Sequence, residues 1–148
     1  APDKGVPASG HTYLCLHGSS DWSYAFREPI PGWTGAGHRV IAPDLIGFGK
    51  SDKPKKESFH TLDFHQQVLL ELVEFLGVET LTLVMPEEGA IRELTRLIET
   101  QHGNVALQRL QMPAGRREPA RAYDAPFPDR GHRAALRAFA KLRALKEV

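Results

Sequence analysis

Three short apolar runs, each closed by turn-forming residues, limit what this chain can fold into. Residues 12–16 are apolar or β-forming and stop at His17-Gly18, residues 39–42 stop at Pro43-Asp44, and residues 81–85 stop at Pro86. None of the runs alternates strictly between apolar and polar residues, which is typical of strands buried on both faces of a parallel sheet. A weaker run over residues 105–110 predicts a fourth strand.

The segments between these runs have helical character. Residues 61–76 place Leu69, Leu72, Val73 and Leu76 on one face, with Thr61 as a candidate N-cap and Gly77 as the stop. Apolar spacing also predicts a helix over residues 89–101 and a last helix starting near Pro128. A short helix over residues 22–27 should end near Glu28, because prolines follow it.

This alternation predicts an α/β fold, an open parallel sheet of about four strands with helices on both faces. We expect the first strand to be central and the strand order to be 2-1-3-4. Open sheets of this kind bind ligands beyond the carboxyl ends of their strands, where the winding direction reverses. Any chemistry is therefore expected where the loops after residues 16 and 85 meet.

Length and composition indicate one ordinary globular domain over residues 1–148. The chain is 41% hydrophobic and 25% charged, with a net charge of +1, so we expect neither a nucleic-acid nor a membrane partner. The only cysteine, Cys15, lies inside the first predicted strand and is interpreted as a small core residue. Residues 1–10 are expected to form an irregular lead-in without a signal peptide, and the expected location is cytoplasmic.

Two further stretches invite a functional interpretation. Residues 47–51 read Gly-Phe-Gly-Lys-Ser, but a phosphate-binding P-loop needs four residues between its first glycine and the Gly-Lys pair, so nucleotide binding is not expected. Residues 113–148 are basic and carry an amphipathic pattern. We interpret this segment as a core-packed helix with a solvated basic face, and the alternative is a surface for a membrane or an acidic partner.

Four of these stretches together resemble a known family. Residues 14–18, 22–24 and 39–54 look like haloalkane dehalogenases of the α/β-hydrolase fold, and residues 122–129 resemble a segment that this family carries near the end of its cap domain. The resemblance covers residues 12–84 and 122–139. It implies a partial, truncated and divergent α/β-hydrolase core with a remnant of a cap.

The resemblance also implies a mechanism. In this family a carboxylate after the third strand counted here displaces halide from carbon and forms an ester, which a histidine-activated water then hydrolyses. Backbone N–H groups near His-Gly and just after the nucleophile form the oxyanion hole, and Trp or Asn side chains hold the halide. No cofactor or metal takes part.

Carried over residue by residue, the family pattern is incomplete. Glu87 stands at the nucleophile position with one methylene more than the family's aspartate, and Glu88 replaces the halide-holding tryptophan. His17 and Gly18 correspond to the oxyanion loop, Ser19 to the halide-contacting position, and Trp22 follows in the matched motif. We therefore assign Glu87 as the candidate nucleophile and His17, Gly18, Ser19, Trp22 and Glu88 as candidate oxyanion or substrate-binding residues.

The base and the acid of the family have no counterpart in a matching motif. His102 and His132 are the histidines that the divergent part offers to Glu87, and no Cys/His spacing supports a metal site. A simpler interpretation of Glu87 and Glu88 is that they stabilise the N-terminus of the following helix.

Two functional hypotheses follow. The first is a hydrolase of haloalkane dehalogenase type, with weak activity toward a small organohalide or ester at a cleft between Ser19 and Glu87. The second is a catalytically silent relative that serves as a binding or assembly module. In either case we expect a homodimer, because the second and fourth strands would be open sheet edges.

Overall fold

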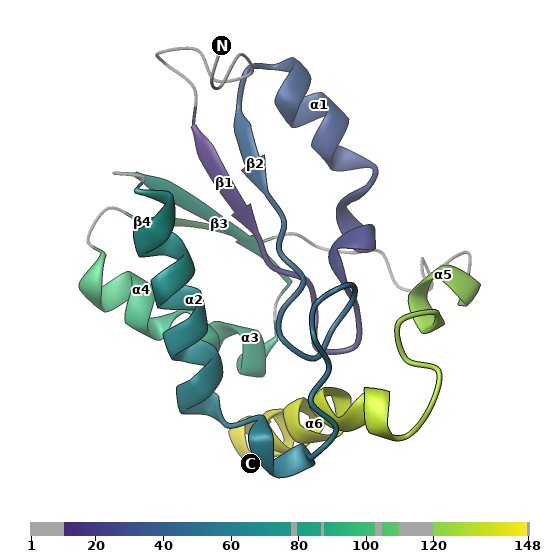
Figure 1. Cartoon of the computed structure of the whole chain (residues 1–148). Helices are drawn as coiled ribbons and strands as arrows, with labels where there is room; N and C mark the ends of the chain where they lie inside the picture. Colours follow the sequence, from purple (N-terminus) through teal and green to yellow (C-terminus); the bar gives the residue numbers. More distant parts are fainter. Residues whose placement is uncertain (1–10, 78–79, 87, 103–104, 110–119, 148) are drawn as a thin grey trace.

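The sheet of this protein contains four parallel strands in the order β2-β1-β3-β4, as predicted. The computed structural model describes residues 11–77, 80–86, 88–102, 105–109 and 120–147. Each strand coincides with one of the apolar runs: β1 is Thr12–Cys15, β2 is Arg39–Ile41, β3 is Leu81–Met85 and β4 is Val105–Arg109. Figure 1 shows the strands running in one direction toward the lower end of the molecule.

The register brings the loops after β1 and β3 together. Tyr13 is paired with Val40 of β2 on one side and with Thr82 of β3 on the other. The pairing continues past the end of β1, where the Leu16 N–H donates to the Val84 carbonyl over 2.8 Å. His17 and Pro86 therefore leave the sheet from neighbouring positions.

Helices cover both faces of the sheet. The α-helices are α1 (Pro29–Gly35), α2 (Leu62–Leu76), α3 (Gly89–Leu94), α4 (Arg96–Gln101), α5 (Ala120–Asp124) and α6 (Ala134–Glu147), and the short 3-10 helices are η1 (Ser23–Phe26), η2 (Glu57–Phe59) and η3 (Gly131–Arg133). Leu14 and Leu83 point to the face of α2, α3 and α4, where the larger core lies. Cys15 and Val84 point to the opposite face, against Phe26 and the α1 residues Ile30 and Trp33.

The predicted ends of α2 are confirmed. The Thr61 hydroxyl accepts a hydrogen bond from the Phe64 N–H over 3.1 Å, and Gly77 closes the helix with a φ of 64°. That backbone conformation is in the left-handed region, which costs glycine least. One face of α2, with Leu69, Leu70 and Val73, is buried in the core.

Two helix predictions were wrong in detail. The short helix predicted over residues 22–27 is the 3-10 helix η1 and ends before Glu28 as expected, but an unpredicted helix, α1, begins at Pro29. The prolines lie in its first turn, whose N–H groups have no partner within the helix, so their missing donors cost nothing there. The helix predicted over residues 89–101 is broken at Thr95, whose hydroxyl bonds the Arg92 carbonyl and the Glu99 carboxylate.

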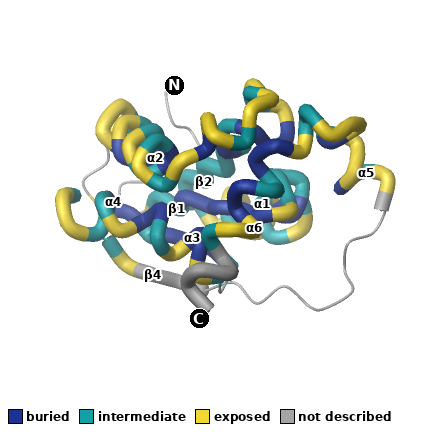
Figure 2. The backbone as a smooth tube through the Cα atoms, turned by 90° about the horizontal axis from the view of Figure 1, so that it is seen from below, coloured by how far each residue is buried: buried dark blue, intermediate teal, exposed yellow. Residues whose placement is uncertain are grey.

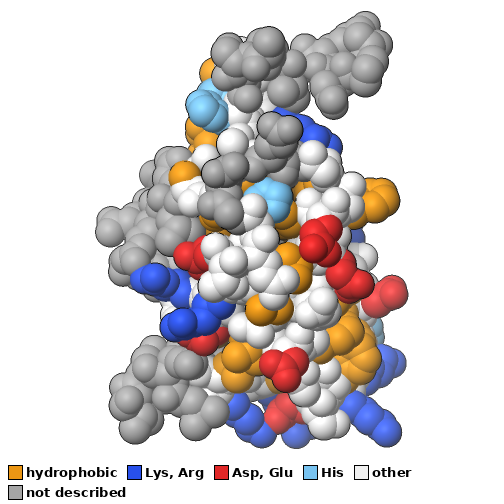
Figure 3. All heavy atoms as spheres, turned by 90° about the vertical axis from the view of Figure 1, so that its left-hand side faces the viewer, with side chains coloured by type: hydrophobic (Ala, Val, Ile, Leu, Met, Phe, Trp, Pro, Cys, Tyr) orange, Lys and Arg blue, Asp and Glu red, His pale blue; other side chains and the backbone are white. Residues whose placement is uncertain are grey.

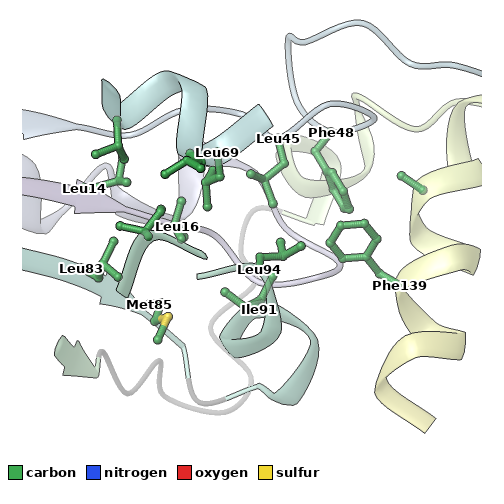
Figure 4. Packing of buried hydrophobic residues seen from close by; sticks show 14 of the residues in the cluster. Leu14, Leu16, Leu45, Phe48, Leu69, Leu83, Met85, Ile91, Leu94 and Phe139 are labelled. Atoms are coloured by element: carbon green, nitrogen blue, oxygen red, sulfur yellow. The ribbon is translucent and has the colours of Figure 1, made fainter. Parts of the chain in front are cut away.

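The larger core joins the sheet to the C-terminal segment. Figure 4 shows the Phe48 and Phe139 side chains next to each other, beyond the leucines of β1, β3 and α2. Their ring centroids lie 5.1 Å apart, and both side chains are fully buried. Figure 2 shows the buried residues running through the middle of the molecule, with the outer sides of the helices exposed. The basic C-terminal segment thus has a core-packed helix, α6, as interpreted from its pattern.

Cys15 is fully buried inside β1. Burial raises the pKa of its thiol to about 12, so the thiolate does not form at neutral pH. The residue acts as a small apolar side chain of the second core. None of the helices in the described ranges has the length and apolar character that a membrane span requires.

Candidate functional site

His17 fixes the loop that follows β1. Its Nδ1 lies 2.7 Å from the Gly18 carbonyl oxygen, and its Nε2 lies 3.1 Å from the Leu45 N–H. Since a carbonyl accepts and an N–H donates, Nδ1 carries the proton and Nε2 is the acceptor. Burial lowers the pKa of His17, against the opposing effects of the Gly18 carbonyl, Asp44 and Glu88, so the ring is neutral. With both nitrogens engaged, His17 positions the loop and does not act as a general base.

Ser19 and Glu88 meet where β1 and β3 end. The Ser19 hydroxyl donates to Glu88 Oε1 over 2.6 Å, and the Ser19 N–H lies 3.3 and 3.2 Å from the two carboxylate oxygens. Gly18 makes room for this contact, because a Cβ there would lie 2.5 Å from Glu88 Oε2 and 3.0 Å from Asp21 Oδ2. The Glu88 carboxylate therefore accepts the hydrogen bond of the Ser19 N–H, a backbone donor in the loop that the family resemblance assigns to the oxyanion hole.

Glu88 is the residue before the first turn of α3, but its side chain makes no capping hydrogen bond. It bonds across to Ser19 instead, so helix capping does not explain the position of this carboxylate. Glu87, the candidate nucleophile, lies outside the described residues. The structure therefore brings together Gly18, Ser19 and Glu88 of the sequence-predicted set.

Trp22 connects the same loop to the cap-like segment. Its indole N–H donates to the Ala122 carbonyl over 3.0 Å, and its ring stacks on Tyr24 with centroids 5.5 Å apart. Arg27 donates to the Tyr123 hydroxyl over 3.0 Å and lies over the Tyr24 ring. The indole N–H of Trp22 holds α5 beside η1. This side chain therefore has a structural role at the edge of the candidate site.

Asp44 organises the second loop at this end of the sheet, and sequence reasoning did not single it out. Its carboxylate accepts from the Ser23 N–H over 2.7 Å and from the Lys50 N–H over 2.9 Å. Gly49 has a φ of 52°, and a Cβ at Gly49 would clash with the Asp44 carboxylate. The hollow of the glycine-rich loop is thus filled by an internal carboxylate rather than left open for a phosphate. The position of Asp44 just after β2, at the carboxyl end of the sheet, could have identified it as a candidate site residue from the sequence.

The histidines considered as bases lie elsewhere. His102 follows α4, next to β4 in sequence, and the ring of His132 bonds Asp129 over 2.7 Å beside η3. That contact lowers the pKa of Asp129. Across the residues that the structure describes, no group of three or more His, Cys, Asp or Glu side chains is arranged to hold a metal ion.

Comparison with known proteins shows similarity to the α/β hydrolase fold and to haloalkane dehalogenases. A family model described as the α/β hydrolase fold matches residues 14–84. Haloalkane dehalogenase 1 of Mycobacterium tuberculosis is 35% identical over 168 aligned residues, which cover 87% of this chain and 55% of that protein. The haloalkane dehalogenase of Psychrobacter cryohalolentis is 36% identical over 115 residues, covering 76% and 38% of the two chains.

Solved structures give the same result. The haloalkane dehalogenase DpaA of Paraglaciecola agarilytica, described as tetrameric, superposes with a TM-score of 0.74 at 32% identity over 90% of this chain and 57% of its own. An epoxide hydrolase of Vigna radiata superposes with a TM-score of 0.60 at 29% identity, over 82% and 41% of the two chains. The present chain thus spans about half the length of these two dehalogenases, 55% of the Mycobacterium protein and 57% of DpaA.

Proposed function

Since this chain has the core of the α/β-hydrolase fold and resembles haloalkane dehalogenases over most of its length, we propose that it binds a small molecule where β1 and β3 end and hydrolyses organohalides or esters only weakly. In this proposal Glu87 is the nucleophile of the residual reaction, and Gly18 and Ser19 line the binding site with Glu88. Figure 1 shows this end of the sheet facing α3 and α6.

The observation that carries the proposal is the contact between Ser19 and Glu88. A hydrolase of this type has to stabilise negative charge, on an oxyanion or on a departing halide, with donors that are free to receive it. Here the Ser19 N–H and hydroxyl already bind a carboxylate, which repels a second anion. This carboxylate does not repel a neutral small molecule, whereas it opposes the negative charge that develops during turnover.

Loss of a positioned base also supports weak turnover. His17 is engaged through both ring nitrogens, and a general base typically contributes about 10²–10⁴-fold in rate. We therefore expect turnover about 10²–10⁴-fold below that of a related hydrolase with a positioned base.

The test measures halide release from a 1-bromoalkane and hydrolysis of a nitrophenyl ester by the purified chain. Glu87→Gln removes the candidate nucleophile, and Glu88→Gln is the matched variant that removes one carboxylate charge at nearly constant size. We expect low rates in the wild type, a further loss in Glu87→Gln, and a gain in Glu88→Gln because its amide no longer repels an anion. Robust halide release by the wild type, abolished in Glu87→Gln, would contradict the weak-turnover proposal.

A second candidate function, assembly without catalysis, is favoured by the sheet edges. β2 and β4 are the two end strands of the described sheet. A strand at an edge offers backbone N–H and C=O groups to another chain. We propose a homodimer on this basis. Light scattering at high micromolar concentration tests it, and a monomer would rule this candidate out.

A further inference from the structure

A buried pair of histidines lies away from the candidate site, at the junction of α2 and the loop before it. His60 Nδ1 and His65 Nε2 are 3.0 Å apart, the two rings are stacked at 14°, and both residues are buried. His60 Nε2 lies 3.1 Å from the Pro54 carbonyl oxygen. Because that carbonyl can only accept, His60 is protonated at Nε2 and accepts at Nδ1 from the Nε2–H of His65. The His60 ring is therefore neutral in this arrangement, and His65 contributes its Nε2–H to the bond.

The pair forms part of the surface on which α6 packs. The Phe139 ring of α6 meets the His65 ring edge to face, with centroids 4.9 Å apart. On the other ring, a Cβ at Gly47 would lie 2.8 Å from His60 Cε1 and would collide with Ala135 of α6. The first turns of α6 are thus packed against the histidine pair and the adjoining loop with little space left.

A continuous row of rings connects this pair to the candidate site. Phe139 packs on Phe48, and Phe48 packs on His17 with centroids 4.9 Å apart. His17 in turn holds Gly18 through its Nδ1–H. A movement of Phe139 away from Phe48 would therefore remove the support behind the loop that carries Ser19.

The charged groups around the pair lie on its outer side. Glu57 of η2 forms ion pairs with Arg137 and Lys141 of α6, and the hydrogen bond from Lys141 lowers the pKa of Glu57. In the loop before η2, the Lys53 ammonium donates to the Gly49 and Ser51 carbonyls. Figure 3 shows Lys and Arg side chains predominating along the lower end of one face, the level at which η2 and α6 lie in Figure 1.

These groups do not supply a counter-charge to the histidines. The charge that acts on the His65 ring is that of His60, which opposes protonation. Burial is the main cause of the lowered pKa in both residues, and it brings the pKa of His65 to about 4. A proton added to either ring is therefore unfavourable as long as α6 stays in place.

We propose that the His60–His65 pair is a proton-operated latch that holds α6 over the carboxyl end of the sheet. In neutral solution the Nε2–H of His65 binds the bare Nδ1 of His60 and the pair presents an apolar surface to Phe139. A proton that arrives at His60 Nδ1 places two N–H groups against each other and breaks the hydrogen bond. A proton at His65 Nδ1 keeps the bond but leaves a positive charge beneath the Phe139 ring. Undocking of α6 exposes the rings to water, which separates the two opposed N–H groups in the first case and solvates the positive charge in the second.

The latch proposal is based on the contacts of His60, His65 and Phe139, and it does not depend on whether the candidate site has hydrolase activity. Hydrogen–deuterium exchange of the full chain at pH 7 and pH 5, corrected for the intrinsic exchange rates, tests it. We expect the amides of α6 to lose protection by at least about tenfold at pH 5, toward the rate of free peptide, while the amides of β3 stay protected. Loss of protection in α6 and β3 together, or unchanged protection of α6, would overturn the proposal.

Variants separate the latch from general effects of acid. His65→Phe keeps a ring of similar size and removes one of the two titrating rings and the hydrogen bond between them, so protection of α6 should depend on pH clearly less than in the wild type. His132→Gln, beside the start of α6, is the matched control and should behave as the wild type. If His65→Phe does not fold, the Nε2–H proton of His65 in the wild type provides a second readout by NMR. It should be observable at pH 7 and disappear on the same pH profile as the protection of α6, and a signal that persists at pH 5 would overturn the latch.

Discussion

His17 and the His60–His65 pair are both buried, but they satisfy their ring nitrogens in different ways. His17 bonds only backbone groups, the Gly18 carbonyl and the Leu45 N–H. The pair depends on a hydrogen bond between two titratable rings, with one backbone partner at Pro54. Backbone partners do not titrate, so in the loop after β1 only the His17 ring can take up a proton, and burial opposes that protonation. The docking surface of α6 is held by a bond that a single proton can break.

The difference shows why burial alone does not define the role of a histidine. Burial lowers the pKa at all three rings. At His17, however, the Gly18 carbonyl, Asp44 and Glu88 act in the opposite direction, whereas at His65 the neighbouring His60 acts in the same direction as burial. One region is therefore built to position a loop, and the other has the properties of a pH-sensitive contact.

Phe139→Ala should have the largest effect, because it removes the ring that joins the two regions. Phe139 is fully buried between Phe48 and His65. We expect a loss of about 3–5 kcal/mol in the free energy of unfolding, from the lost burial and the cavity left behind. Urea denaturation measures it. Phe75→Ala is the control, since Phe75 is 87% exposed and its loss should change stability by no more than about 0.5 kcal/mol. Equal effects of the two variants would mean that α6 does not contribute to the core.

His17→Phe should cost about 2–4 kcal/mol, because the Leu45 N–H and the Gly18 carbonyl both lose a buried partner. This cost should be smaller at pH 5.5 than at pH 7, because the folded pKa of His17 is lowered and the wild type loses stability as the pH falls below the unfolded value of about 6.5. His38→Gln, at an exposed hydrogen bond to the His11 N–H, is the control and should be close to neutral. A cost for His17→Phe that stays constant between pH 7 and pH 5.5 would mean that the folded chain protonates His17 as readily as the unfolded chain does.

His65 should make stability depend on pH. Its folded pKa of about 4 is below the unfolded value of about 6.5, so the unfolded chain binds more protons between these values. Its contribution is fully present above about pH 6.5 and is lost as the pH falls toward 4, by about 2–3 kcal/mol. Urea denaturation at several pH values should show a flatter profile for His65→Phe than for the wild type. Parallel profiles would show that other groups cause the acid sensitivity.

Ser19→Ala should have the smallest effect of the set. It removes the hydroxyl that donates to Glu88 Oε1 but keeps the Ser19 N–H contact. We expect a loss of about 1–2 kcal/mol, typical of one hydrogen bond to a charged group in a partly buried site. The double-mutant cycle with Glu88→Gln measures the coupling directly. A coupling energy near zero would mean that the carboxylate is held at Ser19 by other contacts.

The four strands and their parallel arrangement could be predicted from the sequence. Apolar runs without alternation require burial on both faces, and parallel strands joined by helices follow from that requirement. The caps of α2 at Thr61 and Gly77 could also be predicted, because capping depends on residues close in sequence. The same local chemistry placed His17, Gly18, Ser19 and Glu88 at the ends of β1 and β3.

The hydrogen bonds between these groups depend on how distant segments pack, and the sequence did not predict them. The contact of Glu88 with Ser19 spans 69 residues, and the ion pairs of Glu57 with α6 span 80 or more, so no local pattern encodes them. His60 and His65 are five residues apart, yet their burial depends on Phe139 and Ala135 from α6. Periodicity fixes which face of an element is buried, but the partner on that face is chosen by packing between distant segments.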